Sequence, residues 1–210
     1  MRCLLLSLVA LLSFSANSQP VEVDLYTNVL VANEELVKGN DVTLIQGDNQ
    51  LVVEFDGRLK QKNKPVTVSV RPQIIVVSGI VPATDKLAIK LAAKTVKQLE
   101  NLQKDNSPLF LVYVNGELIE TSQQELPAKP GLFPYIDPLK LVKQHNNELG
   151  LIFDSGHIRS LKNELEAVQN KPGSLAHSEE TEATLELKLW YNRASEEERK
   201  AFRRWMIDQE

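Results

Sequence analysis

Apolar and polar residues alternate with a period near two along the first third of the chain, which is typical of β-strands with one buried face. Short clusters of Asn, Asp, Gly and Glu separate the apolar stretches and favour turns. We therefore predict a β-meander to about residue 60, followed by two further strands around Pro72, where the proline indicates a bend or a sheet edge. The predicted strands are 21–25, 29–31, 42–44, 51–55, 66–70 and 74–77.

The middle of the chain changes from the strand period to the helix period. Residues 87–91 alternate as a strand does, whereas Val96, Leu99 and Leu102 recur at helical spacing. Asn115 and the glycine after it favour a two-residue hairpin turn. The predicted elements are a strand to residue 92, a helix over 94–104, and strands over 109–114 and 118–119.

A proline-rich stretch over 123–137 predicts a loop, and residues 127–138 are the one candidate seam in the chain. Residues 140–147 form a short piece that is either amphipathic or strand-like, and 149–153 are apolar again. Apolar residues at helical spacing predict a helix over 157–170, which a Lys-Pro-Gly-Ser run then ends.

The last thirty residues carry the clearest helical pattern. An apolar stripe at helical spacing runs over 183–194, and Ser195 with Glu198 has the spacing of a capping box that begins a second helix. Acidic residues at the start of this second helix and basic residues further along match the helix dipole. We predict an αα-hairpin that buries Trp190 and Trp205 on the sheet or against each other. The predicted buried face of the second helix is Phe202, Trp205 and Met206.

Together these elements predict an α+β fold: an antiparallel β-sandwich-like body with added helices and a C-terminal αα-hairpin. Since no Gly- or Ser-rich linker interrupts the pattern, residues 19–210 are predicted to form a single secreted domain.

The first eighteen residues have the pattern of a signal peptide. A positive start is followed by an apolar run over 4–14, and Ala16 and Ser18 are the small residues that a signal peptidase reads. The alternative is a membrane anchor, but the run is well short of the roughly 20 residues that a spanning helix needs. We therefore predict a signal peptide over 1–18, cleavage before Gln19, and a periplasmic location.

Composition narrows the class of protein. The chain has 24 basic and 28 acidic residues, and removal of Arg2 with the signal peptide changes its net charge from −4 to −5. This acidity argues against a nucleic-acid binder, and no second long apolar segment predicts a membrane span. Cys3 is the only cysteine and lies in the signal peptide, so the mature chain has neither disulfides nor thiolate metal sites.

The sequence offers no catalytic constellation, and we assign no catalytic, cofactor-binding or metal-binding residue and no cofactor. The histidines lack partners at the spacing of a metal site, and the neighbouring acids are expected in loops or at helix starts. The sequence leaves open whether two of the scattered acids form a catalytic carboxylate pair. The residues considered are His145, His157, His177, Asp154, the pair Glu34 and Glu35, and the pair Glu179 and Glu180.

The aromatic residues near the C-terminus could line a groove, although aromatics at helical spacing more often belong to a core. Arg199 could pair with Glu196 or stack on an aromatic ring. The aromatic residues concerned are Trp190, Tyr191, Phe202 and Trp205.

The C-terminal hairpin resembles the closing motif of the YccT-like family of secreted proteins of Gram-negative bacteria. The motif residues are Leu-Lys-Leu-Trp-Tyr over 187–191, Ala194, Ser195, Arg199, Phe202 and Trp205. The N-terminal part agrees through Val-Asp-Leu at 23–25, a Gly-Asn turn at 39–40 and a hairpin over 47–55. The resemblance implies a periplasmic protein without established enzyme activity, and one role associated with the family is restraint of curli-type amyloid fibre assembly. No family residue carries over as catalytic.

Three function classes follow. The favoured hypothesis is a non-enzymatic periplasmic protein that binds an envelope or extracellular protein, such as a curli-type fibre subunit, because sheet edges can add a partner strand. The alternatives are an envelope hydrolase that uses a carboxylate pair, and a structural module of an envelope assembly. Two carboxylates facing each other across a cleft would favour the hydrolase.

Overall fold

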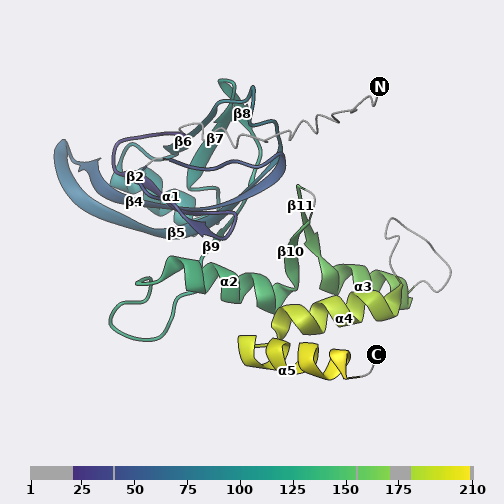
Figure 1. The fold of residues 1–210 in the computed structure, drawn as a ribbon. Helices are drawn as coiled ribbons and strands as arrows, with labels where there is room; N and C mark the ends of the chain where they lie inside the picture. Colours follow the sequence, from purple (N-terminus) through teal and green to yellow (C-terminus); the bar gives the residue numbers. More distant parts are fainter. Residues whose placement is uncertain (1–20, 40, 155, 171–180, 209–210) are drawn as a thin grey trace, which may run out of the picture.

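The computed structural model describes residues 21–39, 41–154, 156–170 and 181–208 (Figure 1). The fold is α+β, as predicted: strands make up the N-terminal body and most helices follow it in the chain. The strands are β1 (Glu22–Val23), β2 (Thr27–Ala32), β3 (Glu35–Leu36), β4 (Gly47–Gln61), β5 (Lys64–Ile80), β6 (Leu87–Leu91), β7 (Phe110–Val114), β8 (Glu117–Ile119), β9 (Ser122–Glu125), β10 (Leu151–Asp154) and β11 (His157–Ser160). The helices are α1 (Val96–Lys104), α2 (Pro138–Leu149), α3 (Leu161–Asn170), α4 (Glu182–Arg193) and α5 (Glu196–Ile207).

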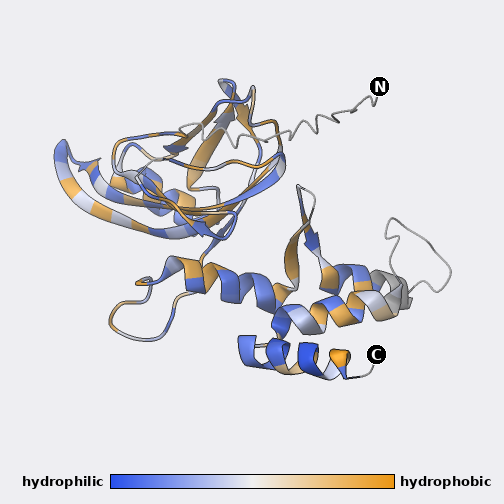
Figure 2. Ribbon diagram, viewed as in Figure 1, coloured by the Kyte–Doolittle hydropathy of each residue, from blue (hydrophilic) through white to orange (hydrophobic). Residues whose placement is uncertain are grey.

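The body consists of two sheets that share one core. A five-stranded sheet has the order β3-β2-β4-β5-β9, and a four-stranded sheet has the order β1-β6-β7-β8. Their pairing is antiparallel except between β1 and β6. Val53 and Ile75 from one sheet belong to the same buried cluster as Ile89 and Phe110 from the other. Figure 2 shows the apolar residues concentrated in this strand body. The body is therefore sandwich-like, as the sequence predicts.

The five-stranded sheet also has a second covered face. Val52 and Ile74 point away from the shared core and pack, with Leu126, against Val142 of α2. Asp137 caps the start of α2 by accepting from the Lys140 amide at 3.0 Å. The left-handed conformation of Gly150 ends the helix. Burial on both faces explains why the centres of β4 and β5 are continuously apolar rather than alternating.

A helical arm follows α2 (Figure 1). The β10–β11 ribbon rises from it toward the sheet body, and α3 packs against α4 around Leu161, Leu185 and Leu189. None of the helices within the described residues is long and apolar enough to cross a membrane.

Residues 42–44 are not a strand, which corrects one prediction. Val42 and Leu44 are buried, but the side chain of Asn49 binds the adjoining backbone in place of a neighbouring strand. Its Oδ1 accepts from the Ile45 amide and its Nδ2 donates to the Ile45 carbonyl, each at 2.8 Å. The buried amide side chain thus satisfies backbone groups that a strand would have paired.

The second half of the chain brings two more corrections and settles one open alternative. Residues 123–125, predicted as part of the loop, belong to the edge strand β9 because Gln123 and its neighbours pair with β5. Residues 157–160, predicted as the start of a helix, pair with β10 as β11, and the helix begins only at Leu161. The ambiguous piece at 140–147 is helical, within α2. The predicted signal peptide lies outside the described residues, as does the Lys-Pro-Gly-Ser run at 171–174 that is predicted to end the helix.

The C-terminal αα-hairpin is present, but the predicted burial of its aromatic residues is wrong. The capping box of Ser195 and Glu198 begins α5 as expected. Trp190 is 69% exposed and Trp205 is 55% exposed, and α5 contains no buried residue. Trp205 stacks only on Phe202 of its own helix, with ring centroids 5.6 Å apart. Helical spacing predicts the face on which these residues lie but not whether a partner covers that face.

This exposure gives a direct prediction for Trp205→Ala. Because the indole contacts solvent and one half-exposed ring, we expect the free energy of unfolding to fall by less than about 1 kcal/mol. Leu189→Ala in α4 is the contrast, since Leu189 is buried and its loss should destabilise the protein more. Urea titration of both variants measures the difference, and a loss of several kcal/mol for Trp205→Ala would show that the indole is a core residue.

Candidate functional site

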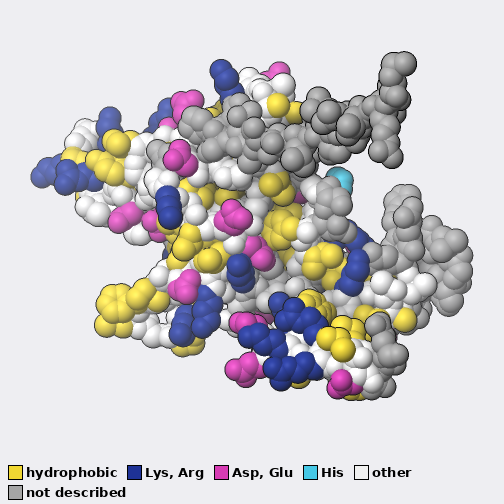
Figure 3. Space-filling model, viewed as in Figure 1, with side chains coloured by type: hydrophobic (Ala, Val, Ile, Leu, Met, Phe, Trp, Pro, Cys, Tyr) yellow, Lys and Arg dark blue, Asp and Glu magenta, His cyan; other side chains and the backbone are white. Residues whose placement is uncertain are grey.

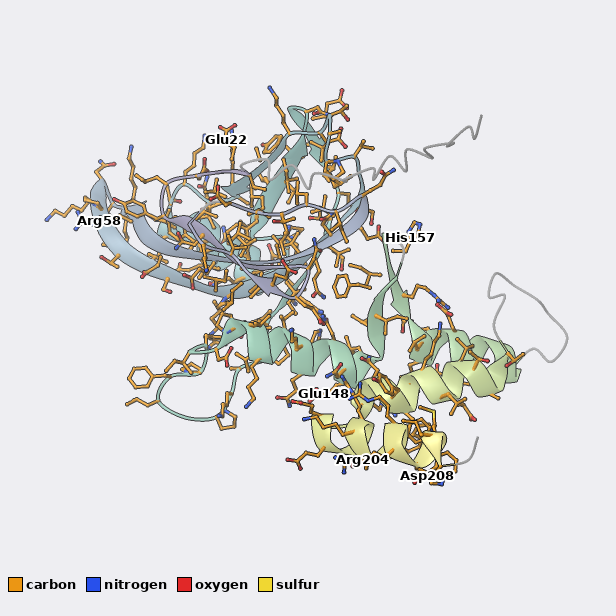
Figure 4. All side chains as sticks on the ribbon, in the orientation of Figure 1. Glu22, Arg58, Glu148, His157, Arg204 and Asp208 are labelled. Atoms are coloured by element: carbon orange, nitrogen blue, oxygen red, sulfur yellow. The ribbon has the colours of Figure 1, made fainter. Side chains whose placement is uncertain are left out.

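The β4–β5 hairpin extends beyond the strands on either side of it (Figure 1). Gln61 pairs with Lys64, so Lys62 and Asn63 alone form the turn. Both turn residues have positive φ angles, 45° and 63°, as a type I′ turn requires. On the outer side of β5, pairing with β9 covers only residues 73–76. Figure 4 labels Arg58 at the far end of this projecting ribbon.

The outer edge of β5 from Lys64 to Val70 is unpaired: no strand within the described residues lies against it. The other edge strands of the two sheets are short, with two residues in β1 and in β3, three in β8 and four in β9. The opposite side of the ribbon is closed in part, since Lys60 forms a bridge with Thr95. The seven-residue stretch of β5, which we call the β5 edge, is therefore the longest open edge of the two sheets.

Antiparallel geometry fixes which backbone groups of the β5 edge face outward. In a two-residue hairpin the closing pair, Gln61 and Lys64, turns its N–H and C=O groups toward each other, and the direction alternates from there. Val66 and Val68 therefore bond to β4, whereas Pro65, Thr67 and Ser69 direct their backbone groups outward. Pro65 lacks an N–H group, so the outward donors of this stretch are the amides of Thr67 and Ser69.

A register shift separates the β5 edge from β9. Val53 pairs with Gln73 and Phe55 with Val70, so Arg71 and Pro72 together oppose one residue of β4. This β-bulge is the bend that Pro72 indicates in the sequence. The Leu126 amide then donates to the Pro72 carbonyl at 2.8 Å, after which the chain leaves the sheet. Beyond the end of β9, the space next to the outward backbone groups of Thr67 and Ser69 is therefore open, and a further strand could lie there.

A polar groove with a volume of about 710 Å³ lies beside the β5 edge. It is formed by β5, β9 and the end of α1, and most of its lining side chains are amides or hydroxyls. The amide of Gln123 joins the two sheets at its base: Nε2 donates to the Phe110 carbonyl at 2.6 Å, and Oε1 accepts from the Phe110 amide at 3.1 Å. The polar lining residues are Ser69, Arg71, Gln73, Gln103, Asn106, Ser107, Thr121, Ser122, Gln123, Gln124 and Glu125.

Charged groups mark one end of this groove. Arg71 Nη1 lies 2.9 Å from Glu125 Oε1, and the hydrogen bond to Glu125 raises the pKa of Arg71. The Tyr135 hydroxyl donates to the same carboxylate oxygen at 3.2 Å. Burial first, and then the charge of Glu125, raises the pKa of Tyr135. Glu125 is the single acid that lines the groove, so a facing carboxylate pair does not line it.

The projecting ribbon is strongly basic although the chain is acidic overall. Residues 57–71 contain five basic and no acidic side chains. Figure 3 shows Lys and Arg side chains at the far end of the ribbon. The basic residues are Arg58, Lys60, Lys62, Lys64 and Arg71. Such a surface opposes pairing between two copies of this edge and favours an acidic or neutral guest.

A second groove, about 490 Å³ in volume, lies between the 127–137 loop and α2 and contains two acids. Asp137 and Glu148 stand at opposite ends of α2, eleven residues apart, which is about 16 Å along a helix. Figure 4 labels Glu148 near the end of that helix. A carboxylate pair that hydrolyses a glycoside needs roughly 5 to 10 Å, so these two acids do not form one.

Two of the other residues named in the sequence analysis, Glu34 and His157, have structural contacts. Glu34 accepts from the buried Asn146 amide at 2.8 Å. His157, at the tip of the β10–β11 ribbon in Figure 4, lies 3.7 Å from Asp48. Glu35 lies in β3, while His177 and the pair of acids at 179–180 are outside the described residues. No cluster of three metal-ligating side chains forms within the described residues.

His145 lies at the contact between α2 and β9, and burial lowers its pKa below the ordinary value of 6.5. Its Nε2 is 2.7 Å from Gln124 Nε2, so the Gln124 amide donates to an unprotonated ring nitrogen. The nearby charge of Glu148 opposes the lowering of this pKa but does not cancel it. The folded state therefore disfavours the protonated imidazole.

This lowered pKa predicts an acid-sensitive stability. Neutral His145 contributes fully to the free energy of unfolding above about pH 6.5. This contribution is lost as the pH falls from there through the lower pKa of His145 in the folded state. In His145→Gln, the urea midpoint should fall less between pH 7 and pH 5 than in the unchanged protein. If the urea midpoints of the two proteins change equally between pH 7 and pH 5, then His145 does not contribute to the pH dependence of stability.

Sequence reasoning missed the β5 edge. The signals were present: valines alternate with polar residues over 64–70, Pro65 stands at the beginning, and Lys62 and Asn63 sit between two strand patterns. Lys-Asn is not among the dipeptides that typically mark a type I′ turn, and the extent of neighbouring strands cannot be read from the strand itself.

Comparison with known proteins places the chain among bacterial relatives. A UPF0319 protein of Vibrio vulnificus (strain YJ016) is 32% identical over 164 residues, which cover 77% of this chain and 75% of the relative. A UPF0319 protein of Vibrio parahaemolyticus is 27% identical over 181 residues, which cover 85% of this chain and 79% of the relative. No solved structure matches the chain. Residues 18–205 match the family model described as "Uncharacterized protein conserved in bacteria (DUF2057)", and the chain therefore belongs to this family of uncharacterised bacterial proteins.

Proposed function

We propose that the protein binds an extended segment of another polypeptide along the β5 edge and so restrains an extracellular fibre subunit of the curli type. The observation that carries the proposal is the seven-residue open edge, with the outward amides of Thr67 and Ser69 next to a polar groove. An added strand gains main-chain hydrogen bonds that depend little on its sequence.

The chemistry of the surroundings supports a polar guest strand. Amide and hydroxyl side chains line the groove, so Asn, Gln, Ser and Thr on the guest would find donors and acceptors there. The basic residues of the ribbon complement acidic groups on the guest. Amyloid-forming subunits present extended segments of this kind to a growing fibre end, where amide ladders stabilise the stack.

The same edge limits what can be added to it. Pro65 removes one outward donor, and the bulge at Arg71 and Pro72 interrupts the edge at its other end. A guest segment is therefore held over a short stretch. Bound in this way, a subunit has one strand edge occupied and cannot present that edge to a fibre. The expected signal peptide at 1–18 would bring the protein to the periplasm, where such subunits pass before export.

The proposal predicts a loss of fibre restraint in Thr67→Pro. This change removes one outward amide, whereas the inward bonds of Val66 and Val68 to β4 remain. We expect affinity for the subunit to fall at least about fivefold, which corresponds to the loss of one hydrogen bond, and the delay of fibre growth to shorten accordingly. Thioflavin fluorescence during growth of a purified curli-type subunit measures the delay.

Thr67→Ala is the matched control, because it removes the same side chain but keeps the amide. It should restrain growth as the unchanged protein does. If the unchanged protein does not delay growth, or if the alanine and proline variants lose the effect equally, then the outward amide of Thr67 is not the binding group and the proposal fails.

A further inference from the structure

The last helix, α5, is a complete helix that has almost no packing partner. Ser195 caps it, and Lys200 Nζ lies 2.6 Å from Glu196 Oε1 along its surface. Its attachment to α4 runs mainly through Arg199, which donates to the carbonyls of Tyr191 and Asn192 at 2.9 and 2.8 Å. None of its own side chains is buried.

Three large apolar side chains of α5 lie on one side of the helix, and two of its four cations lie on the opposite side. At 100° per residue, Phe202, Trp205 and Met206 fall on one face, and Lys200 and Arg204 fall on the opposite face. Residues 199–207 hold four basic residues and no acid, whereas the three acids of α5 lie in its first turn, at 196–198. Arg203 and Arg204 form no ion pair with any residue that the structure describes.

Helix α4 extends the exposed apolar surface of α5. Leu187 and Trp190 of α4 are exposed, and an apolar slot of about 430 Å³ lies between the two helices. The Arg199 guanidinium lies over the Tyr191 ring, 5.2 Å from its centroid, at the rim of this slot. Figure 3 shows Lys and Arg side chains gathered beside apolar ones over this end of the molecule.

We propose that the α4–α5 hairpin binds the surface of a membrane that contains anionic phospholipids. The combination of a cationic face with exposed tryptophan and tyrosine is what an interfacial helix needs: the rings enter the headgroup region and the cations bind lipid phosphates. The cations of residues 199–207 favour this occupant, because an anionic bilayer attracts them and they stand beside exposed aromatic rings, which the basic ribbon over 57–71 lacks. The site is separate from the β5 edge.

Intrinsic fluorescence provides a direct test, since Trp190 and Trp205 are the only tryptophans in the chain. The protein is mixed with vesicles of phosphatidylcholine alone, or of phosphatidylcholine and phosphatidylglycerol in equal parts. We expect the emission to shift to shorter wavelength, and the protein to float with the vesicles, only when phosphatidylglycerol is present. Added salt should weaken both effects.

The double variant Arg203→Gln, Arg204→Gln should bind about 30-fold more weakly, because each basic residue at an anionic surface contributes about fivefold. Both residues are exposed, so the fold should be unchanged. The matched control is Lys62→Gln, Lys64→Gln on the distant ribbon, which alters net charge equally and should bind normally. The proposal is overturned if the control loses as much affinity, if the emission does not shift, or if light scattering without vesicles shows that the hairpin pairs with a second copy.

Discussion

Replacing Gly47 with alanine is expected to lower the free energy of unfolding by about 3 kcal/mol. Gly47 begins β4 with φ of +94°, and a Cβ atom there would overlap the carbonyl oxygen of Gly156. That carbonyl accepts from the Asp48 amide at 2.7 Å, and the Asp48 carboxylate accepts from the Ile158 amide at 3.1 Å. The substitution would therefore separate the β10–β11 ribbon from the sheet.

Gly79→Ala distinguishes the energetic cost of a positive φ angle from the cost of the steric overlap with Gly156. Gly79 also has a positive φ, +75°, but a Cβ atom on it would meet nothing within 4 Å. Its alanine variant should lose only about 1 kcal/mol, the cost of the backbone conformation. Urea unfolding of both variants measures the difference. Equal losses would mean that the contact with Gly156 contributes nothing and that the helical arm is held elsewhere.

Asn146→Ala is expected to cost about 2 to 4 kcal/mol. Asn146 of α2 and Gln50 of β4 are both buried and exchange two amide hydrogen bonds, at 2.8 and 2.9 Å. Asn146 also donates to Glu34 at 2.8 Å. Alanine would leave the buried Gln50 amide without its Asn146 partner, and a buried polar group without a partner is costly.

Gln144→Ala tests whether that loss is specific to the buried pair. Gln144 is on the same helix but is exposed, and it bonds only to Glu148 in the next turn. We expect a change within about 0.5 kcal/mol. Thermal unfolding of the two variants side by side measures the contrast. If both variants lose the same stability, then the helix itself has been weakened and the pair with Gln50 does not anchor it.

Local patterns predict much of this fold. Asn115 and Gly116 form the predicted hairpin turn, both with positive φ, and Thr95 caps α1 one residue inside the predicted start of that helix. Ser195 and Glu198 form the predicted capping box. These features depend on side chains a few residues apart, which is why sequence alone reveals them.

Features that depend on distant partners were not predicted. Residues 42–44 lack strand pairing, and the side chains of Asn33 and Asn49 bind the backbone of Thr43 and Ile45 there. Residues 122–125 are a strand because β5 has a free side there. Trp205 is exposed because no element of the described chain covers the face of α5 on which it lies. The open β5 edge belongs to the same class, since it is defined by where β9 stops. Tertiary context, rather than local propensity, decides each of these cases.

Amide hydrogen exchange at the β5 edge, followed by NMR, shows whether a guest strand pairs with Thr67 and Ser69. In the free protein the outward amides of Thr67 and Ser69 should exchange quickly, whereas those of Val66 and Val68, bonded to β4, should be protected. On addition of a curli-type fibre subunit, Thr67 and Ser69 should become protected while Val66 and Val68 stay unchanged. If the subunit binds and the amides of Thr67 and Ser69 still exchange quickly, then no strand has been added and the β5 edge is not the binding site.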